Sequence, residues 1–152
     1  WVAAQRHMGF EMDPRELSSS DKTLLKAVTS WWKENRQWMR DANILRLPCI
    51  DKSVTAEIQI NSVENHFVVF AGQNASSGFS SPVPLVLAGL DSMAMYNVSL
   101  HNKNHINSLG KSKGGLLQKT LKLSGQFLMS HGLQLPKVFP ANMMVIEGDK
   151  AA

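Results

Sequence analysis

The sequence predicts a mainly β protein in which one long helix precedes about six to eight short strands. Two observations lead to this fold class. Apolar residues recur with a helical period before residue 40, and short alternating or continuous apolar runs follow residue 43. The spacing of those runs, with turn residues between them, is typical of a β-sandwich. We therefore expect one boundary, near residues 40–43, between the helical segment and the sandwich.

The helix is predicted over residues 21–39, and it holds three of the four tryptophans. Ser18 to Ser20 offer hydroxyls for the N-cap, and Asp21 places negative charge in the first turn, where the helix dipole favours it. Because a broad apolar face is usually core, we expect these tryptophans to be mostly buried rather than to stack against sugars. Two neighbouring lines make up that face: Leu24, Val28, Trp31 and Trp38, and beside them Leu25, Trp32 and Met39.

The strands are expected in the following order. Alternation over residues 54–60 predicts a half-buried strand, and the continuous apolar run over 66–72 predicts a more deeply buried one. Turn residues fill 74–82, and a strand is expected over 83–88, where Pro84 places its start at an edge or an irregular position. Further segments are two alternating strands over 94–100 and 117–123, the polar hairpin loop 101–115 between them, one helical turn over 126–131, and a last strand over 143–147.

The composition limits the class of protein. The chain of 152 residues suits one domain, and with 43% hydrophobic and 18% charged residues it has enough apolar side chains for a core. The net charge of +4 is mild and the lysines are dispersed, which argues against a nucleic-acid-binding protein. Cys49 is the only cysteine in the sequence, which excludes an internal disulfide and favours a cytoplasmic location.

The sequence shows neither a membrane-spanning run nor a signal-peptide pattern at its start. No apolar run approaches the ~20 residues that a membrane-spanning helix needs, so we expect no association with a membrane. No basic-then-apolar start resembles a signal peptide. The sequence begins at Trp1 without an initiator methionine, and its first dozen residues have the character of a domain interior. We expect the chain to be a piece of a longer protein.

Acidic and histidine side chains are the candidate catalytic or metal-binding residues. Glu11 and Asp13 form a closely spaced pair suited to acid and base roles, but they more simply close a strand-like segment before a turn at Pro14. His101 and His105 are four residues apart, yet they fall in the polar loop and lack the glutamate of a zinc-binding HExxH pattern. We therefore expect no catalytic residue, no metal site and no cofactor among these groups.

The remaining motifs are weaker. GKSKGG (residues 110–115) resembles a phosphate loop superficially, but it lacks the GxxxxGKS or GxxxxGKT order and is better explained as a flexible basic turn. The glycosylation sequons at Asn74 and Asn97 matter only in a secreted protein. No serine or cysteine lies in a recognisable nucleophile context. The other histidines, which lie in separate predicted elements, are His7, His66 and His131.

Several stretches match segments of one known family in order and separation. HMGFEMDPREL (7–17) is similar to a GHxGxExDPxxL segment, and WKENRQW (32–38) is similar to the helix that follows it. LVLAGLD (85–91), SGQFLMSHGLQLP (124–136) and ANMMVIEG (141–148) are similar to an LxGLD motif, an SGxxLxxxGLxLP motif and a terminal strand. Together these stretches resemble family 36 of the glycoside hydrolases, the large α-galactosidases and melibiases, over nearly the whole chain.

The resemblance implies a position within a larger enzyme. In such enzymes a catalytic (β/α)8 barrel is followed by a small antiparallel β-sandwich. Residues 1–41 would be the last strand and last helix of that barrel, and residues 42–152 the C-terminal antiparallel β-sandwich. The upstream barrel of the same protein is then the expected partner, and the tryptophan-bearing helix joins the two parts. If a tryptophan is exposed in this chain alone, the missing barrel is the first explanation.

The resemblance also implies a mechanism for the whole enzyme. Members retain anomeric configuration by a double displacement, in which one aspartate attacks the anomeric carbon and a second carboxylate acts as acid and base. Both belong to motifs upstream of these residues, so this chain is expected to be structural and inactive alone. The whole enzyme would be a retaining α-galactosidase that hydrolyses terminal α-linked galactose from galacto-oligosaccharides. Such enzymes often form homo-oligomers, and a parent acting on an N-acetylgalactosaminide stays open.

Two other classes of function also stay open. A stand-alone carbohydrate-binding β-sandwich would need exposed aromatic side chains, and the strand region offers no tryptophan. Its aromatic residues, most of them in apolar runs, are Phe67, Phe70, Phe79, Tyr96, Phe127 and Phe139. A basic adaptor for acidic polymers would bind through dispersed lysines, and we expect such binding to disappear at high salt. Those lysines are Lys103, Lys111, Lys113, Lys119 and Lys122.

Overall fold

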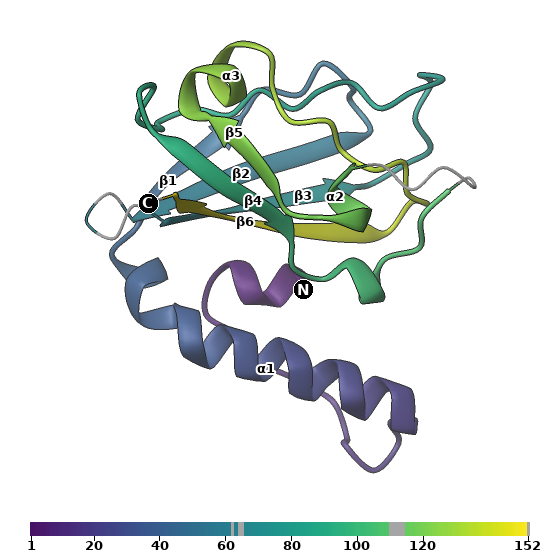
Figure 1. The fold of residues 1–152 in the computed structure, drawn as a ribbon. Helices are drawn as coiled ribbons and strands as arrows, with labels where there is room; N and C mark the ends of the chain where they lie inside the picture. The colour runs from purple at the N-terminus through teal and green to yellow at the C-terminus, as the bar shows by residue number, and fades with distance from the viewer. Residues whose placement is uncertain (62, 64–65, 110–114, 152) are drawn as a thin grey trace.

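The computed structural model describes residues 1–61, 63, 66–109 and 115–151, and these form one antiparallel sheet with a long helix across one face (Figure 1). The order of the strands in the sheet is β1-β2-β3-β6-β4-β5, so the C-terminal strand lies in the middle. The fold is mainly β, as the sequence predicts. The strands are β1 (Asn43–Leu47), β2 (Val54–Asn61), β3 (His66–Gln73), β4 (Met95–Leu100), β5 (Leu121–Ser124) and β6 (Asn142–Lys150).

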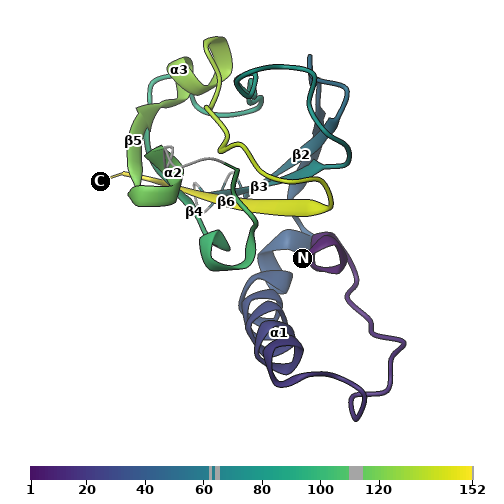
Figure 2. The same cartoon turned by 90° about the vertical axis from the view of Figure 1, so that its right-hand side faces the viewer.

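The long helix α1 (Ser19–Arg40) confirms the predicted helix. Its first turn is closed by a capping box, in which Ser18 Oγ accepts a hydrogen bond from the Asp21 amide and the Asp21 carboxylate accepts one from the Ser18 amide. Figure 2 shows α1 on one side of the sheet and α3 on the other. The short helices are η1 (Val2–Gln5), η2 (Lys103–His105), α2 (Gly115–Gln118) and α3 (Gly125–Ser130), the last of which is the predicted helical turn.

The central strand β3 is buried on both faces. Phe67 and Val69 point into the larger hydrophobic cluster, here called the main core, under the coil layer. Val68 and Phe70 point the other way, toward Trp31 of α1. This burial on two faces explains why residues 66–72 form a continuous apolar run instead of alternating. The helix-side core consists of Ala4, Val28, Trp31, Met39, Val68, Phe70 and Val145.

The layer over the main core is coil and short helix rather than a second sheet among the described residues. The strand predicted over 83–88 is wrong, because only Leu85 pairs, in an isolated antiparallel bridge with Leu133. Pro84 has no amide hydrogen to donate to a ladder. Gly132, with φ of 84°, ends α3, and a Cβ there would lie 2.8 Å from the Leu85 carbonyl oxygen. Glycine at position 132 therefore lets the two backbone segments approach closely enough to form the Leu85–Leu133 bridge. This isolated bridge is found where a strand of a second sheet was expected.

Four other segments differ from the prediction. β1 was not predicted, and the strand expected over 117–123 is reduced to β5, with Leu117 in α2 instead. The loop 101–115 contains η2, and residues 110–114 lie outside the described residues. The residues before α1, which the resemblance assigns to the last strand of the barrel, contain η1 and no strand. No described strand runs beside this segment to supply ladder hydrogen bonds.

Among the described residues, no helix combines the length and the apolar character needed to cross a membrane.

Candidate functional site

Trp31 of α1 is a core residue and not a sugar platform. Its side chain is 3% exposed, and its Nε1 donates a hydrogen bond to Glu147 Oε1 at 2.5 Å. Its ring packs edge-on against Phe70, with 5.9 Å between centroids, and against Trp1, with 5.7 Å. The residue therefore buries its apolar surface while its one polar atom is paired.

The other two tryptophans of α1 are half-buried and also engaged. Trp32 Nε1 donates to the Arg6 carbonyl at 2.8 Å, and the Arg36 guanidinium lies 5.2 Å from the Trp32 ring centroid. Trp38 Nε1 donates to Asn35 Oδ1 at 2.8 Å. The ring of Trp38 also packs edge-on against His66. The expectation of burial is thus confirmed fully for Trp31 and in part for the other two.

A charged group lies beneath α1, where Glu147 of β6 accepts hydrogen bonds from two elements. Besides Trp31, His101 Nδ1 lies 3.2 Å from Glu147 Oε2. Burial of Glu147 would raise its pKa, but the hydrogen bonds from His101 and Trp31 and the charge of His101 outweigh burial. The pKa of Glu147 therefore lies below its ordinary value. This carboxylate stays ionised under the helix.

The histidines considered as metal ligands flank an aromatic ring instead. The His101 ring packs edge-on against Trp1, with 5.4 Å between centroids, and the His105 ring stacks on Trp1 at 6.2 Å. Across residues 1–61, 63, 66–109 and 115–151, no group of three His, Cys, Asp or Glu could hold a metal ion.

The predicted carboxylate pair lies on the exposed segment before α1. Glu11 is exposed, and Asp13 binds Arg15 through a 2.6 Å ion pair. The hydrogen bonds from the Arg15 side chain and backbone hold the pKa of Asp13 below its ordinary value. A general acid needs a raised pKa, so Asp13 is poorly suited to that role. Its hydrogen bond from the Arg15 amide instead stabilises the turn at Pro14.

The remaining candidates are spread over the molecule. His66 Nδ1 pairs with Asp149 Oδ1, while His131 stacks on Phe127 with 5.1 Å between centroids. His7 is exposed, as are both sequon asparagines, Asn74 after β3 and Asn97 in β4. Of the lysines of the adaptor hypothesis, Lys103 in η2, Lys119 after α2 and Lys122 in β5 are exposed. Lys111 and Lys113 of GKSKGG lie outside the described residues.

A shallow hollow lies between the first half of α1 and the segment before it; we call it the outer hollow. Its volume is about 230 Å³. Phe10 is 41% exposed and Met12 is 49% exposed at its edge. Exposed apolar side chains that gather around one concave surface are typical of an interaction site. The apolar residues that line the outer hollow include Trp1, Phe10, Met12, Leu17, Leu24 and Leu25.

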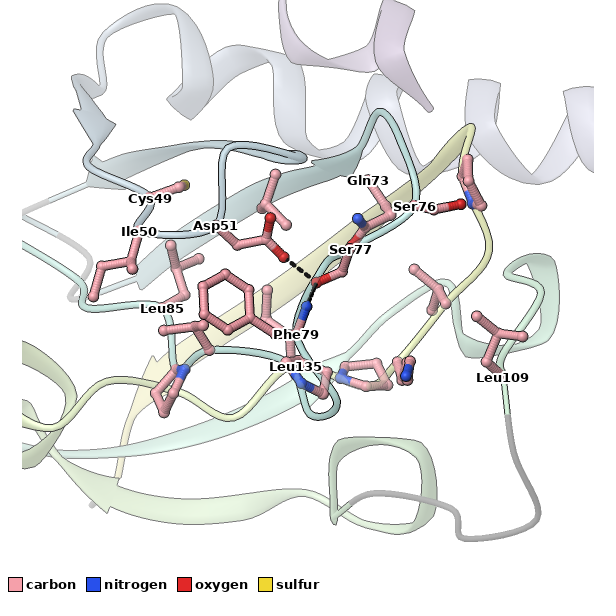
Figure 3. A pocket seen from close by; sticks show the side chains of 18 of the residues that line it. Cys49, Ile50, Asp51, Gln73, Ser76, Ser77, Phe79, Leu85, Leu109 and Leu135 are labelled. Carbon is pink, nitrogen blue, oxygen red and sulfur yellow. Dashed lines mark hydrogen bonds between the residues drawn. The ribbon is translucent and has the colours of Figure 1, made fainter.

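A second pocket, here called the end pocket, opens where β3 ends and β6 begins (Figure 3). It has a volume of about 340 Å³. Asp51, which is 6% exposed, forms part of the wall. Its Oδ1 accepts hydrogen bonds from the amide and hydroxyl of Ser53, and its Oδ2 accepts one from Ser77 Oγ at 2.5 Å. These bonds from Ser53 and Ser77 hold the pKa of Asp51 below its ordinary value.

The rim of the end pocket is apolar and accessible to solvent. Ile50 is 70% exposed, Phe79 is 45% exposed and Phe139 is 50% exposed. Cys49 also lines the pocket, but burial raises the pKa of its thiol, which keeps it protonated and a poor nucleophile. Of the aromatic residues weighed for sugar binding, Phe67, Phe70 and Tyr96 are buried; those exposed are Phe79, Phe127 and Phe139.

Sequence reasoning missed the end pocket. The Asp51–Ser53 pair is a local signal, because an Asp side chain often hydrogen-bonds the backbone two residues on. The sequence predicts a turn for the segment that holds Phe79, and no pattern in it places Phe139 nearby. The residues that line the pocket come from four separate parts of the chain, 49–54, 73–85, 109 and 135–140. No local sequence pattern indicates that these segments lie together in the fold.

Comparisons with known proteins identify the domain. Residues 54–150 match the family model described as the glycosyl hydrolase family 36 C-terminal domain. An α-galactosidase of Escherichia coli is 22% identical over 151 residues, which are 95% of this chain and 21% of that protein. The chain thus spans about a fifth of the length of the curated relative it matches.

Solved structures share the fold over the whole chain. The GH36 α-galactosidase AgaB from Geobacillus stearothermophilus is 19% identical, with a TM-score of 0.75, over 99% of this chain and 18% of that one. AgaA A355E from the same organism, in complex with 1-deoxygalactonojirimycin, gives 20% identity and a TM-score of 0.76 over the same shares. The α-galactosidase from Lactobacillus brevis gives 14% identity and a TM-score of 0.75.

The family match begins at β2 and ends with β6, so it takes in most of the sheet and more than half of the chain. It confirms the resemblance that the sequence motifs indicate. The chain belongs to glycosyl hydrolase family 36 and carries the family's C-terminal domain.

Proposed function

We propose that this chain is the structural C-terminal part of a retaining α-galactosidase that removes terminal α-linked galactose from galacto-oligosaccharides. One observation carries the proposal: structures named as α-galactosidases cover 99% of this chain, while the chain covers only 18% of each. In this proposal the catalytic carboxylates belong to the much larger remainder of such a protein. The chain by itself is then inactive.

The proposal assigns two roles along the chain. Residues 1–41 are the end of the catalytic (β/α)8 barrel, and residues 42–152 are the C-terminal domain. The likeness to α-galactosidase structures supports this division, because it extends across α1, which precedes the matched residues 54–150. The change from helix to strand at residues 40–43 supports it as well.

The outer hollow is the surface that the rest of the barrel would cover. A buried aromatic side chain removes about 150–250 Å² from water, and apolar burial stabilises by about 25 cal/mol per Å². Covering Phe10 and Met12 would therefore contribute several kcal/mol, on the same estimate, to the attachment of the segment that precedes α1. The sheet holds α1 through Trp31, whose ring packs against Phe70 of β3. The domain would act as a rigid support for the closing helix of the barrel.

The chemistry would proceed without a residue of this chain. In a retaining enzyme, one carboxylate attacks the anomeric carbon, and another protonates the leaving oxygen and then activates water. Asp13 is ion-paired with Arg15, and Glu147 is hydrogen-bonded beneath α1, so both have structural partners. The contribution of this chain would be to hold α1, and through it the barrel, in position.

An assay with an aryl α-galactoside tests the proposal. We expect the longer polypeptide of the reading frame that contains this chain to hydrolyse the substrate. We expect the 152-residue chain to release no product above a blank. NMR of the first product should show the α anomer if configuration is retained. Turnover by the chain alone would contradict the structural role, and a longer protein that prefers an aryl N-acetyl-α-galactosaminide would change the substrate.

A further inference from the structure

The end pocket has the size of a small-molecule site. Its volume of about 340 Å³ lies within the range of roughly 300–1,000 Å³ that is usual for such sites. An apolar cavity of about 150 Å³ can hold benzene, so this pocket has room for roughly two fused rings. The pocket is separate from the outer hollow, since the two have no lining residue in common.

The walls of the end pocket are mainly apolar, and their backbone is constrained. Leu85 and Leu135 are buried in the wall, while Phe79 and Phe139 stand half-exposed at the rim. Four of the lining residues are prolines, whose ring fixes φ and limits the conformations open to the wall: Pro82, Pro84, Pro136 and Pro140. When a pocket is already formed, ordering its walls takes little away from the free energy of ligand binding.

Most polar groups of the wall are already hydrogen-bonded. Gln73 Nε2 donates to Ser53 Oγ and to the Ala75 carbonyl, both at 2.7 Å. Lys137 Nζ donates to the Ser80 carbonyl at 3.0 Å. A sugar presents hydroxyls on all sides and needs many free partners. Apart from the two further donors of the Lys137 ammonium, these engaged groups supply few. The lining therefore favours an apolar ligand over a carbohydrate.

Asp51 determines which polar group such a ligand can carry. It accepts three hydrogen bonds, from the Ser53 amide, the Ser53 hydroxyl and the Ser77 hydroxyl, whereas an ionised carboxylate has about four acceptor sites. One further donor can therefore be accepted, and the negative charge disfavours an anionic ligand.

We propose that the end pocket binds a neutral, mainly apolar molecule of about two rings that carries one hydrogen-bond donor. The rings lie between the side chains of Phe79 and Phe139, and the donor points toward Asp51. This site is independent of the proposed glycosidase function, because none of its residues is assigned a role in galactoside hydrolysis.

Calorimetric titration of 2-naphthol into the longer polypeptide, with galactose present at saturation to occupy any sugar site, tests this proposal. We expect saturable binding with a dissociation constant of about 10–100 μM, ordinary for a ligand of this size. The anion 2-naphthoate should bind at least about tenfold more weakly, because of the charge on Asp51. Equal affinity for the two probes, or no saturable binding of 2-naphthol, would overturn the proposal.

Variants locate the binding. Phe79→Ala and Phe139→Ala should each weaken binding of 2-naphthol by about tenfold, because each removes one wall of the rim. Phe127→Ala is the matched control, since Phe127 is 42% exposed but stacks on His131 away from the pocket. Both rim residues are exposed, so these variants should fold. Equal weakening in all three variants would place the ligand elsewhere.

Two further outcomes name another occupant and overturn the proposal. If raffinose without added galactose binds the wild type and not Phe79→Ala, the site takes a carbohydrate. If sedimentation shows that Phe79→Ala and Phe139→Ala convert an oligomer to smaller species, a second copy of the protein covers the pocket. In both cases 2-naphthol would show no saturable binding at this place.

Discussion

The two faces of the sheet are closed in different ways. The main core lies between the strands and the coil layer of the same domain, and it includes fully buried residues such as Phe67, Ile58 and Leu128. The helix-side core is smaller and depends on one added element, α1, whose Trp31 packs over Phe70. The first face is complete within the domain. The second holds a helix beside the outer hollow, where apolar side chains are still exposed, and this is the surface that we propose the rest of the protein covers.

The largest effect should come from opening the main core. Phe67 is fully buried and packs against Tyr96, and its ring lies over Gly148, where a side chain would clash. We expect Phe67→Ala to lower the free energy of unfolding by about 3–5 kcal/mol. Urea denaturation measures this change. Phe127→Ala, at an exposed position, should change it by less than about 0.5 kcal/mol; equal losses would mean that the core is misassigned.

Removing one hydrogen bond from the helix-side core should lower the free energy of unfolding by less than Phe67→Ala does. Trp31→Phe keeps an aromatic ring but removes the donor to Glu147. We expect the free energy of unfolding to fall by about 2 kcal/mol, because a hydrogen bond to a half-buried charge is lost. Trp38→Phe removes a bond to neutral Asn35 at a half-buried position and should cost less. If the second variant is the less stable one, the importance given to the Trp31–Glu147 bond is wrong.

The same group makes the helix-side core sensitive to acid. Because the pKa of Glu147 is lowered in the folded state, its ionised form stabilises the fold above the ordinary pKa of about 4.3. That stabilisation is lost as pH falls through the lowered pKa. Between about pH 5 and about pH 3, wild type should therefore lose more stability than Glu147→Gln. Glu34→Gln, which changes an exposed residue of α1, should lose as much as wild type. Parallel stability profiles for wild type and Glu147→Gln would contradict this role.

The smallest effect should come from the ion pair between Arg6 and Glu57, which connects the segment before α1 to β2. Two hydrogen bonds, of 2.6 and 2.9 Å, join the side chains, but Arg6 is 51% exposed. A double-mutant cycle with Arg6→Gln and Glu57→Gln should give a coupling energy of about 0.5 kcal/mol, decreasing in high salt. A coupling above about 2 kcal/mol would mean that this contact, rather than α1, secures the N-terminal segment.

The sequence predicts those elements in which buried apolar residues repeat at a regular spacing along the chain. The helix is predictable because Trp31 and Trp38, with Leu24 and Val28, repeat along one face. The β1 strand is not, since four of its five residues are exposed and it becomes a strand through pairing with β2. Leu117 and Leu121 were placed on one strand, yet their spacing of four also fits a helix, and Leu117 lies in α2.

For the candidate sites, too, local features could be predicted from the sequence and contacts between distant residues could not. Burial of Trp31 could be predicted from its helical line, but its partner Glu147 lies 116 residues away in sequence and could not. Asp51 and Phe139 meet at the end pocket only after the chain folds. The motifs indicated the family because their order and their separation along the chain can be compared directly in the sequence, without knowledge of the fold.

The central claim is that α1 is held by the sheet on one side and by the rest of the enzyme on the other. Amide hydrogen exchange tests it most directly, by comparing this chain with the longer polypeptide of its reading frame. We predict that residues 21–32 exchange at least about tenfold more slowly in the longer protein, while residues 67–71 of β3 exchange at similar rates in both. Equal exchange of residues 21–32 in the two proteins would contradict the claim.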